Sequence, residues 1–243
     1  MIGYSLWVAV GIALAALAAR WQGPPAVLSQ RQRSALLLCA VGGAVLGAYG
    51  LQLPADLLGL QAPPPAGVSG GDALPLGGRT VLGGLIGGWL AVEWGKRRAG
   101  ITAPTGDAFA LPLALALGCG RLGCASAGCC AGSECAPHWW AWVDAEGVPH
   151  LPVQWAEAAF HFAMAGWLAR CVRTGTATGR RLALYLSLYA ALRFVLELVR
   201  LQPVAWLGLT WHQGLALVLL LLAGSTWWRR ARSLSQSAVL QRP

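Results

Sequence analysis

A short segment near the middle of the chain gathers residue types that can carry out chemistry. Residues 118–132 hold one arginine, Arg121, together with four cysteines and five glycines, and they directly follow an apolar run at residues 108–117. A charged side chain beside such a run is costly to bury and is usually retained for function. Glycines there let a neighbouring backbone or a lipid headgroup approach closely. We therefore expect the chemistry of this chain to centre on Arg121.

A second charged set lies near the end of a later apolar run. Arg193 and Glu197 are four residues apart and share one helix face, which Arg200 continues three residues later. One interpretation is an ion pair within the helix that neutralises a polar patch. The other is that Arg193 and Arg121 converge on an anionic group while Glu197 orients one guanidinium. A planar guanidinium donates two parallel hydrogen bonds to a phosphate, so arginine suits that second role.

A third polar set opens the apolar stretch at residues 153–172. Pro152 is a helix start signal, and Gln154 and Glu157 lie three residues apart on one face of the helix that follows. These two side chains are either a plain polar helix start or part of a substrate-binding site at the outer end of the helix.

The seven cysteines fall into two groups. Cys39 and Cys171 lie in or at the end of apolar stretches and are expected to be small buried residues. The other five lie within 17 residues, and they are Cys119, Cys124, Cys129, Cys130 and Cys135. Their spacing contains no Cys-x-x-Cys pair and is not a standard structural zinc spacing, so we predict neither a metal site nor a cofactor. We expect instead either a disulfide near an oxidising face or a reactive thiolate beside Arg121.

The composition indicates a membrane protein. Hydrophobic residues make up 56% of the 243 residues and charged residues 11%, where a soluble domain carries about 25% charged residues. The net charge is +9, but the basic residues cluster at the ends of apolar stretches. Such flanking charges set topology and contact anionic lipids, so we expect the partner to be a membrane and not a nucleic acid.

Seven apolar stretches predict an all-α, polytopic membrane protein built as one domain over residues 1–243. They cover residues 2–19, 35–53, 80–95, 107–123, 153–172, 182–199 and 211–228, and a membrane-spanning helix needs about 20 residues. The third and fourth are short and interrupted by glycines. The first has no basic residue before its apolar run, so we expect a retained helix and not a cleaved signal.

The basic residues predict the orientation. If the N-terminus lies outside, the cytoplasmic segments hold 14 of the 18 lysines and arginines, and seven spans then put the C-terminus in the cytoplasm. Two long segments fall outside in this arrangement. Residues 54–78 are rich in proline and glycine and predict an extended loop. Residues 133–152 contain three tryptophans and predict either a lid over the cysteine segment or an anchor at the membrane interface.

The order and spacing of these residues resemble those of the prolipoprotein diacylglyceryl transferase family. The resemblance runs from about residue 77 to residue 213 and rests on short motifs. These are Gly83-Gly84-Leu85-Ile86-Gly87-Gly88 with the basic turn Lys96-Arg97-Arg98, Gly120-Arg121-Leu122-Gly123 with Gly128 and Gly132, Pro152-x-Gln154-x-x-Glu157, Arg193-Phe194-x-x-Glu197-x-x-Arg200, and His212-Gln213-Gly214.

The resemblance implies seven spans and a reaction at the outer leaflet of a bacterial inner membrane. The family moves a diacylglyceryl group from the phospholipid phosphatidylglycerol to the thiol of a lipobox cysteine in a lipoprotein precursor, forming a thioether and releasing glycerol phosphate. We expect the catalytic residues to be Arg121, Arg193, Glu197, Cys124 and Cys129, with the thiols either as a covalent way-station for the transferred group or as a disulfide that braces the glycine-rich segment. We expect the substrate-binding residues to be Gly83, Gly84, Gly120, Gly123, Gly128, Gly132, Gln154, Glu157, Arg200 and Gln213.

The chain departs from the family pattern at four positions. The family usually has a histidine before its Gly-Gly-Leu-Ile-Gly run, where this chain has Leu82. After Gly-Arg-Leu-Gly the family usually has two asparagines and an acidic residue, where this chain has Cys124, Ala127 and Cys129. Acid–base groups of the family are thus lost and thiols are gained. The acceptor of the transferred group is therefore open, and a thiol or lipid other than the lipoprotein cysteine fits as well. This exchange also leaves open a membrane thiol–disulfide protein, or a carrier that binds lipid without turnover.

Overall fold

Helices make up every long element of the protein. The computed structural model describes residues 2–23, 28–60, 79–144, 146–200 and 202–240. Its helices are α1 (Ile2–Gln22), α2 (Gln30–Gly50), α3 (Leu53–Leu57), α4 (Val81–Arg98), α5 (Asp107–Ser126), α6 (Val153–Thr174), α7 (Arg181–Leu196) and α8 (Trp211–Leu240), and α7 continues into the 3-10 turn η1 (Glu197–Val199).

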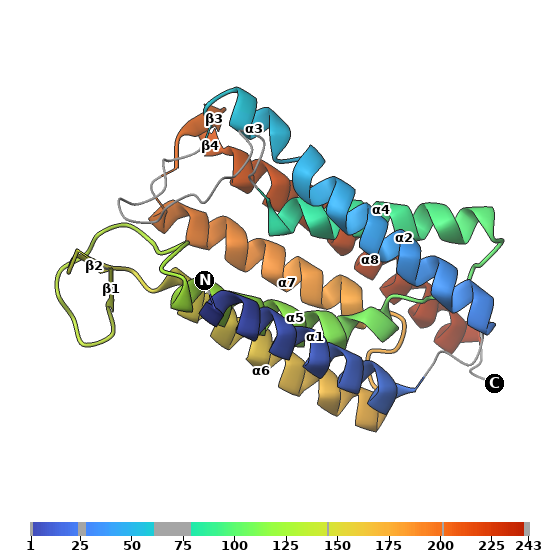
Figure 1. Cartoon of the computed structure of the whole chain (residues 1–243). Coiled ribbons are helices and arrows are strands. Elements are labelled where there is room, and N and C mark those ends of the chain that lie inside the picture. The colour runs from blue at the N-terminus through green and yellow to red at the C-terminus, as the bar shows by residue number, and fades with distance from the viewer. Residues whose placement is uncertain (1, 24–27, 61–78, 145, 201, 241–243) are drawn as a thin grey trace.

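Two short antiparallel hairpins complete the described elements. One pairs β1 (Trp142–Val143) with β2 (Pro149–His150), and the other pairs β3 (Val204–Trp206) with β4 (Leu209–Thr210). The long helices run alternately in opposite directions, so the bundle has two ends (Figure 1). Both hairpins and the N-terminal helix start lie at one of them, which we call the hairpin end.

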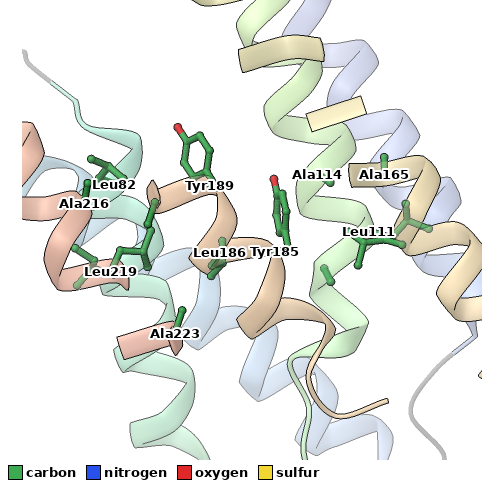
Figure 2. Close-up of a cluster of buried hydrophobic side chains, with 14 of the residues drawn as sticks. Leu82, Leu111, Ala114, Ala165, Tyr185, Leu186, Tyr189, Ala216, Leu219 and Ala223 are labelled. Atoms are coloured by element: carbon green, nitrogen blue, oxygen red, sulfur yellow. The ribbon is translucent and has the colours of Figure 1, made fainter. Parts of the chain in front are cut away.

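Helix α7 lies at the centre of the bundle. It packs against α8 on one side and against α5 and α6 on the other, while α2 packs on α4 and α1 packs on α5. Figure 2 shows Tyr185 and Tyr189 projecting from α7 between these two halves. Leu82 of α4 and Leu219 of α8 lie on one side of α7, and Leu111 of α5 lies on the other. Burial of these side chains holds the two halves together through α7.

The helices agree with the apolar stretches read from the sequence. Each of the seven stretches overlaps a long helix, so the predicted all-α class is confirmed. Among the described residues, four stretches are long and apolar enough to cross a membrane, and they are Gly3–Gln22, Gln30–Leu57, Asp107–Ser126 and Arg181–Val199. Seven spans and their orientation stay predictions.

The predicted loop at residues 54–78 begins as a helix. Its first four residues belong to α3, because Pro54 occupies the first turn, where a missing N–H and a fixed φ favour a helix start. Residues 61–78 lie outside the described residues. The expectation of an extended loop is therefore wrong at residues 54–57 and is not tested at residues 61–78.

Glycines set the close approach of α2 and α4. A Cβ built on Gly47 would collide with the carbonyl oxygen of Gly83. A Cβ built on Gly43 would collide with a side chain of α4 and would lie 2.5 Å from the carbonyl oxygen of Gly87. Each helix thus carries two glycines four residues apart, the arrangement that lets membrane helices pack backbone to backbone. Gly83 was expected to bind substrate, and this contact gives it a packing role.

This packing predicts that Gly47→Ala destabilises the protein. The added methyl meets backbone and not a flexible side chain, so the helices must separate, at a cost of about 1–3 kcal/mol. The apparent Tm of the detergent-solubilised protein should fall by roughly 2–10 °C. Gly42→Ala is the matched control, since a Cβ on Gly42 has nothing within 4 Å. Equal melting of the two variants would contradict the close-packing role.

Candidate functional site

Arg121 lies near the C-terminal end of α5 and connects three helices. It is buried, with 8% of its surface exposed. Its Nε is paired with Oε2 of Glu157 on α6. One of its Nη groups donates a hydrogen bond to the hydroxyl of Tyr189 on α7, at 3.3 Å. The guanidinium is therefore fixed in orientation by partners from two other helices.

Glu157 receives a second guanidinium as well. Nε of Arg193, in the last turn of α7, lies 3.4 Å from Glu157 Oε1. Glu157 itself is fully buried, with none of its surface exposed. The arginines of two sequence motifs, 72 positions apart along the chain, thus meet on one carboxylate. The sequence pattern did not assign this bridging role to Glu157, and the expected convergence of the two arginines on a bound anion stays a prediction.

A second buried carboxylate, Glu197 at the start of η1, contacts Arg193 as well and adds two further groups, Arg200 and His212. Nη1 of Arg193 lies 2.8 Å from Glu197 Oε2, and Nη1 of Arg200 lies 3.9 Å from the same oxygen. Nδ1 of His212, in the first turn of α8, lies 3.5 Å from Glu197 Oε1. The ion pair expected within this helix is therefore present. The role expected of Glu197, to orient a guanidinium toward a bound anion, stays a prediction.

The charges of this arginine cluster do not balance. Among the described residues, Arg121, Arg193 and Arg200 supply three positive charges, and Glu157 and Glu197 supply two negative ones. Removing an uncompensated charge from water is expensive, so the cluster gains stability when an anion binds. A phosphate group, with acceptor oxygens that match the planar fork of arginine, fits this requirement.

A buried polar network beneath the cluster was missed by the sequence analysis. The Tyr185 hydroxyl lies 2.8 Å from Nδ1 of His161, and the rings of His161 and Tyr189 are 4.7 Å apart between centroids. The signal was present as spacing: Tyr185, Tyr189, Arg193 and Glu197 follow one another at four-residue intervals, and His161 is four residues after Glu157. Residues at that interval share one face of a helix, so α6 and α7 face each other with polar stripes.

The cysteine segment folds back on itself directly after α5. Gly128 has a φ of +70°. The Gly128 N–H donates to the Ala125 carbonyl at 3.3 Å, and the Cys129 N–H donates to the Cys124 carbonyl at 3.0 Å. This pair of bonds is a Schellman motif, which ends a helix at a residue in the left-handed region. We call the segment 124–130 the cysteine turn. Gly128 was expected to bind substrate, and the structure shows that it also ends α5 in the left-handed region.

The cysteine turn gathers three sulfur atoms. The Sγ atoms of Cys124, Cys129 and Cys130 all lie within 4.8 Å of one another. None of the seven cysteines is paired in a disulfide in this structure. Hydrogen bonds from the Cys124 and Cys129 thiols lower the pKa of Cys130 well below its ordinary value, and the guanidinium groups of Arg121 and Arg200 act in the same direction. Cys119 is buried in α5, outside this group.

The two glutamines expected at the site, Gln154 and Gln213, have different hydrogen-bond partners. Gln154 is fully buried and donates from Nε2 to the carbonyl oxygen of Cys129 at 3.4 Å. Gln213 instead caps α8, because its Oε1 accepts from the Thr210 N–H at 3.0 Å and its own N–H donates to Thr210 Oγ1. These contacts place Gln154 beside the cysteine turn and give Gln213 a local structural partner.

The glycines expected to bind substrate fall into three environments. Gly84 faces α2, with a built Cβ 3.3 Å from the Ala44 carbonyl, and Gly123 faces Tyr4 of α1 at 3.1 Å. Gly132 lies against Leu151, and a Cβ there would be 2.8 Å from the Leu151 Cβ. Gly120 alone among these faces open space, with nothing within 4 Å of a built Cβ.

The tryptophan-rich segment 133–152 folds into the β1–β2 hairpin beside the cysteine turn. The Trp142 indole lies 3.8 Å from a Cβ built on Gly128. Nε2 of His150 lies 2.9 Å from Oδ2 of Asp144, and this hydrogen bond lowers the pKa of the Asp144 carboxyl. Trp139 is 96% exposed. The segment thus places one tryptophan against the turn and exposes another, and both the lid and the interface anchor stay predictions.

A cavity of about 440 Å³ lies elsewhere, between the start of α2 and the end of α4. Its walls include Ser29, Leu36 and Gly95, and it shares no residue with the arginine cluster.

Comparison with known proteins decides the family. A family model of prolipoprotein diacylglyceryl transferase matches residues 1–229. The chain belongs to this family. The match includes the arginine cluster, the cysteine turn and all of α1 to α7. A comparison with curated proteins found no match. Membership of the diacylglyceryl transferase family makes the chain a membrane protein of transferase type.

Three of the positions at which this chain departs from the family pattern have clear structural surroundings. Leu82, which stands where the family usually has a histidine, is 1% exposed and belongs to the apolar core around α7. Cys124 and Cys129, which stand where the family usually has polar residues, lie together in the cysteine turn. The polar groups of the family are thus replaced by an apolar contact on α4 and by clustered thiols in the cysteine turn.

The geometry predicts that Glu157→Gln destabilises the protein strongly. The change removes the shared carboxylate and leaves Arg121 without a buried counter-ion, which costs about 3–5 kcal/mol. The thermal unfolding of the detergent-solubilised variant should therefore begin well below that of the wild type. Glu146→Gln, at an exposed hairpin position, is the control and should melt like the wild type. A Glu157→Gln protein of wild-type stability would show that the arginines do not depend on this carboxylate.

Proposed function

We propose that this protein transfers a diacylglyceryl group from phosphatidylglycerol to the thiol of a cysteine in a lipoprotein precursor, at the outer leaflet of a bacterial inner membrane. The observation that carries the proposal is the meeting of Arg121 and Arg193 on Glu157. Two fixed guanidinium groups in a buried cluster with excess positive charge suit a phospholipid phosphate. Family membership supports the same reaction class.

The arginine cluster would act on the leaving group. In the transfer, the bond between the glyceryl carbon and the phosphate oxygen breaks, and glycerol phosphate departs with the electron pair. Negative charge on the phosphate grows as the bond lengthens. Donors that are already oriented stabilise that charge without reorganising, and they are worth more in a site that excludes water. Glu157 and Tyr189 provide this orientation for Arg121, and Glu157 with Glu197 provides it for Arg193.

The acceptor thiol must lose its proton before its sulfur attacks. His212 is the described histidine in contact with the arginine cluster, and Glu197 lies beside its Nδ1 at 3.5 Å. A carboxylate on one ring nitrogen orients the imidazole and leaves the other nitrogen to accept a proton. We assign His212 as the base on this ground, in place of the family histidine that Leu82 replaces.

The proposal includes the topology. All seven long helices would span the membrane, with the hairpin end outside and the opposite end in the cytoplasm, because the basic residues gather at that opposite end. The donor lipid would then reach the arginine cluster from the outer leaflet, on the side where a lipoprotein precursor presents its cysteine.

Arginine-to-lysine exchange tests the phosphate role. Arg121→Lys and Arg193→Lys keep the charge but lose the planar fork, so each should lower the transfer rate by about 100-fold or more. The measurement is mass spectrometry of a synthetic lipobox peptide after incubation with purified protein in phosphatidylglycerol vesicles. Arg97→Lys, at an exposed position on the opposite end, should keep full activity. Wild-type rates in both site variants would refute the phosphate role.

Reporter fusions test the topology. A reporter that is active only outside the membrane should be active when fused after residue 146, in the β1–β2 hairpin, and inactive when fused after residue 98, at the end of α4. A reporter that is active only in the cytoplasm should give the reverse pattern. An outside location for residue 98 would overturn the proposed orientation.

A further inference from the structure

The cysteine turn has the geometry of a metal-ligand set. We propose that Cys124, Cys129 and Cys130 form a three-thiolate site for a soft divalent cation, Zn²⁺ first among them, with a fourth coordination position that accepts the thiol of the acceptor cysteine. The metal site stands on its own geometry. Its role in binding the acceptor thiol rests on the proposed function.

The sulfur positions fit one cation. Tetrahedral zinc with Zn–S bonds of about 2.3 Å places its sulfur ligands about 3.8 Å apart. The three Sγ atoms lie within 4.8 Å of one another, so small side-chain adjustments bring all three into the coordination shell. The sequence spacing argued against zinc because it lacks a Cys-x-x-Cys pair. The Schellman turn at Gly128 overcomes that objection, because it brings Cys129 back beside Cys124.

The backbone that carries the sulfurs is held in place from outside the turn. Gln154 donates to the Cys129 carbonyl at 3.4 Å. Just beyond the turn, the Gly132 N–H donates to the Leu151 carbonyl and the Ser133 N–H donates to the Val199 carbonyl, each at 2.8 Å. Metal sites depend on such outer contacts to hold their ligands in position.

The local charges also favour metal binding. Three thiolates with one divalent cation carry a net charge of −1. Arg121 lies three residues before Cys124 on α5, a spacing that puts two side chains on one face of a helix. A guanidinium on that face offsets part of the negative charge of the metal–thiolate group. A soft cation is the matched partner, since thiolates select zinc and similar metals over magnesium or calcium.

One coordination position stays open for an acceptor. Among the described residues, no fourth side chain belongs to this ligand group, and all three cysteines are half-buried, so the site is reachable. Structural zinc sites close with four protein ligands, whereas reactive sites keep one position for substrate. The acceptor thiol would bind there as a thiolate, and its proton would pass to His212, the base assigned above. Its sulfur then attacks the glyceryl carbon, the carbon–oxygen bond breaks, and glycerol phosphate leaves with the bonding electrons. The metal changes neither charge nor oxidation state.

Direct metal binding is the first test. Purified, reduced full-length protein is titrated with Cd²⁺ and, separately, with Zn²⁺, and bound metal is counted by mass spectrometry. We expect one metal per chain and a cadmium–thiolate absorption band in the ultraviolet. Single Cys→Ser changes at residues 124, 129 and 130 should each weaken binding by about 100-fold or more, since even outer contacts of a metal site are worth 10- to 100-fold. Cys135→Ser, a cysteine in the same region outside the ligand group, should bind like the wild type.

Peptide transfer with and without metal separates the two proposals. If the acceptor binds the metal, a chelator should abolish transfer to the lipobox peptide and Zn²⁺ should restore it. Peptide with an intact thiol should also shift the Cd²⁺ absorption band, and peptide with serine in place of cysteine should not. One metal per chain with no transfer under any condition would refute the proposed function and leave the metal site standing. Full transfer by metal-free protein would refute the acceptor role.

The redox state of the cysteines provides the decisive counter-test. Protein purified without reductant is digested, and disulfides are located by mass spectrometry. A disulfide among Cys124, Cys129 and Cys130, with no metal bound after reduction and titration, would overturn the metal site and favour a thiol–disulfide protein. Thermal unfolding of each serine variant shows whether lost binding reflects lost folding, since a variant that melts like the wild type has lost only a ligand.

Discussion

The ion pairs that Glu157 makes with Arg121 and Arg193 constrain three helices at once. Neither guanidinium could lie at this depth without a counter-ion, because charges are costly to remove from water. The shared carboxylate therefore fixes the relative position of α5, α6 and α7 at the hairpin end. Glu197 extends the same constraint to α8 through His212. The apolar core around Tyr185 supports this arrangement from below, so packing and electrostatics act on the same helices.

Most of the fold could be predicted from the sequence, because hydropathy and length alone define helices in an apolar chain. The stretch at residues 107–123 became α5, and the stretch at residues 153–172 became α6 with its start at Pro152, close to the predicted bounds. The end of α7 was harder to predict, since the chain tightens there into η1 before Arg200. Apolar composition does not distinguish an α-helical last turn from a 3-10 turn.

The candidate site was only partly predictable. Charged residues in apolar surroundings identified Arg121 and Arg193 individually, but their shared partner depends on how α5, α6 and α7 pack. The grouping of Cys124 with Cys129 depends on one glycine in the left-handed region, which a spacing rule does not capture. His161 was missed because a single histidine in an apolar stretch carries little signal without the facing stripe of α7. Long-range packing and local backbone geometry are the two kinds of information that the pattern lacked.

The hydrogen bond from the Ser133 N–H to the Val199 carbonyl joins the chain just after the cysteine turn to η1, which carries Glu197. The backbone that follows the cysteines is therefore held next to the backbone that carries Glu197. In the proposed transfer, a substrate that reaches from the arginine cluster to the cysteine turn would meet a restricted span. Such a span would favour acceptors whose thiol projects far enough from its own chain to reach across it.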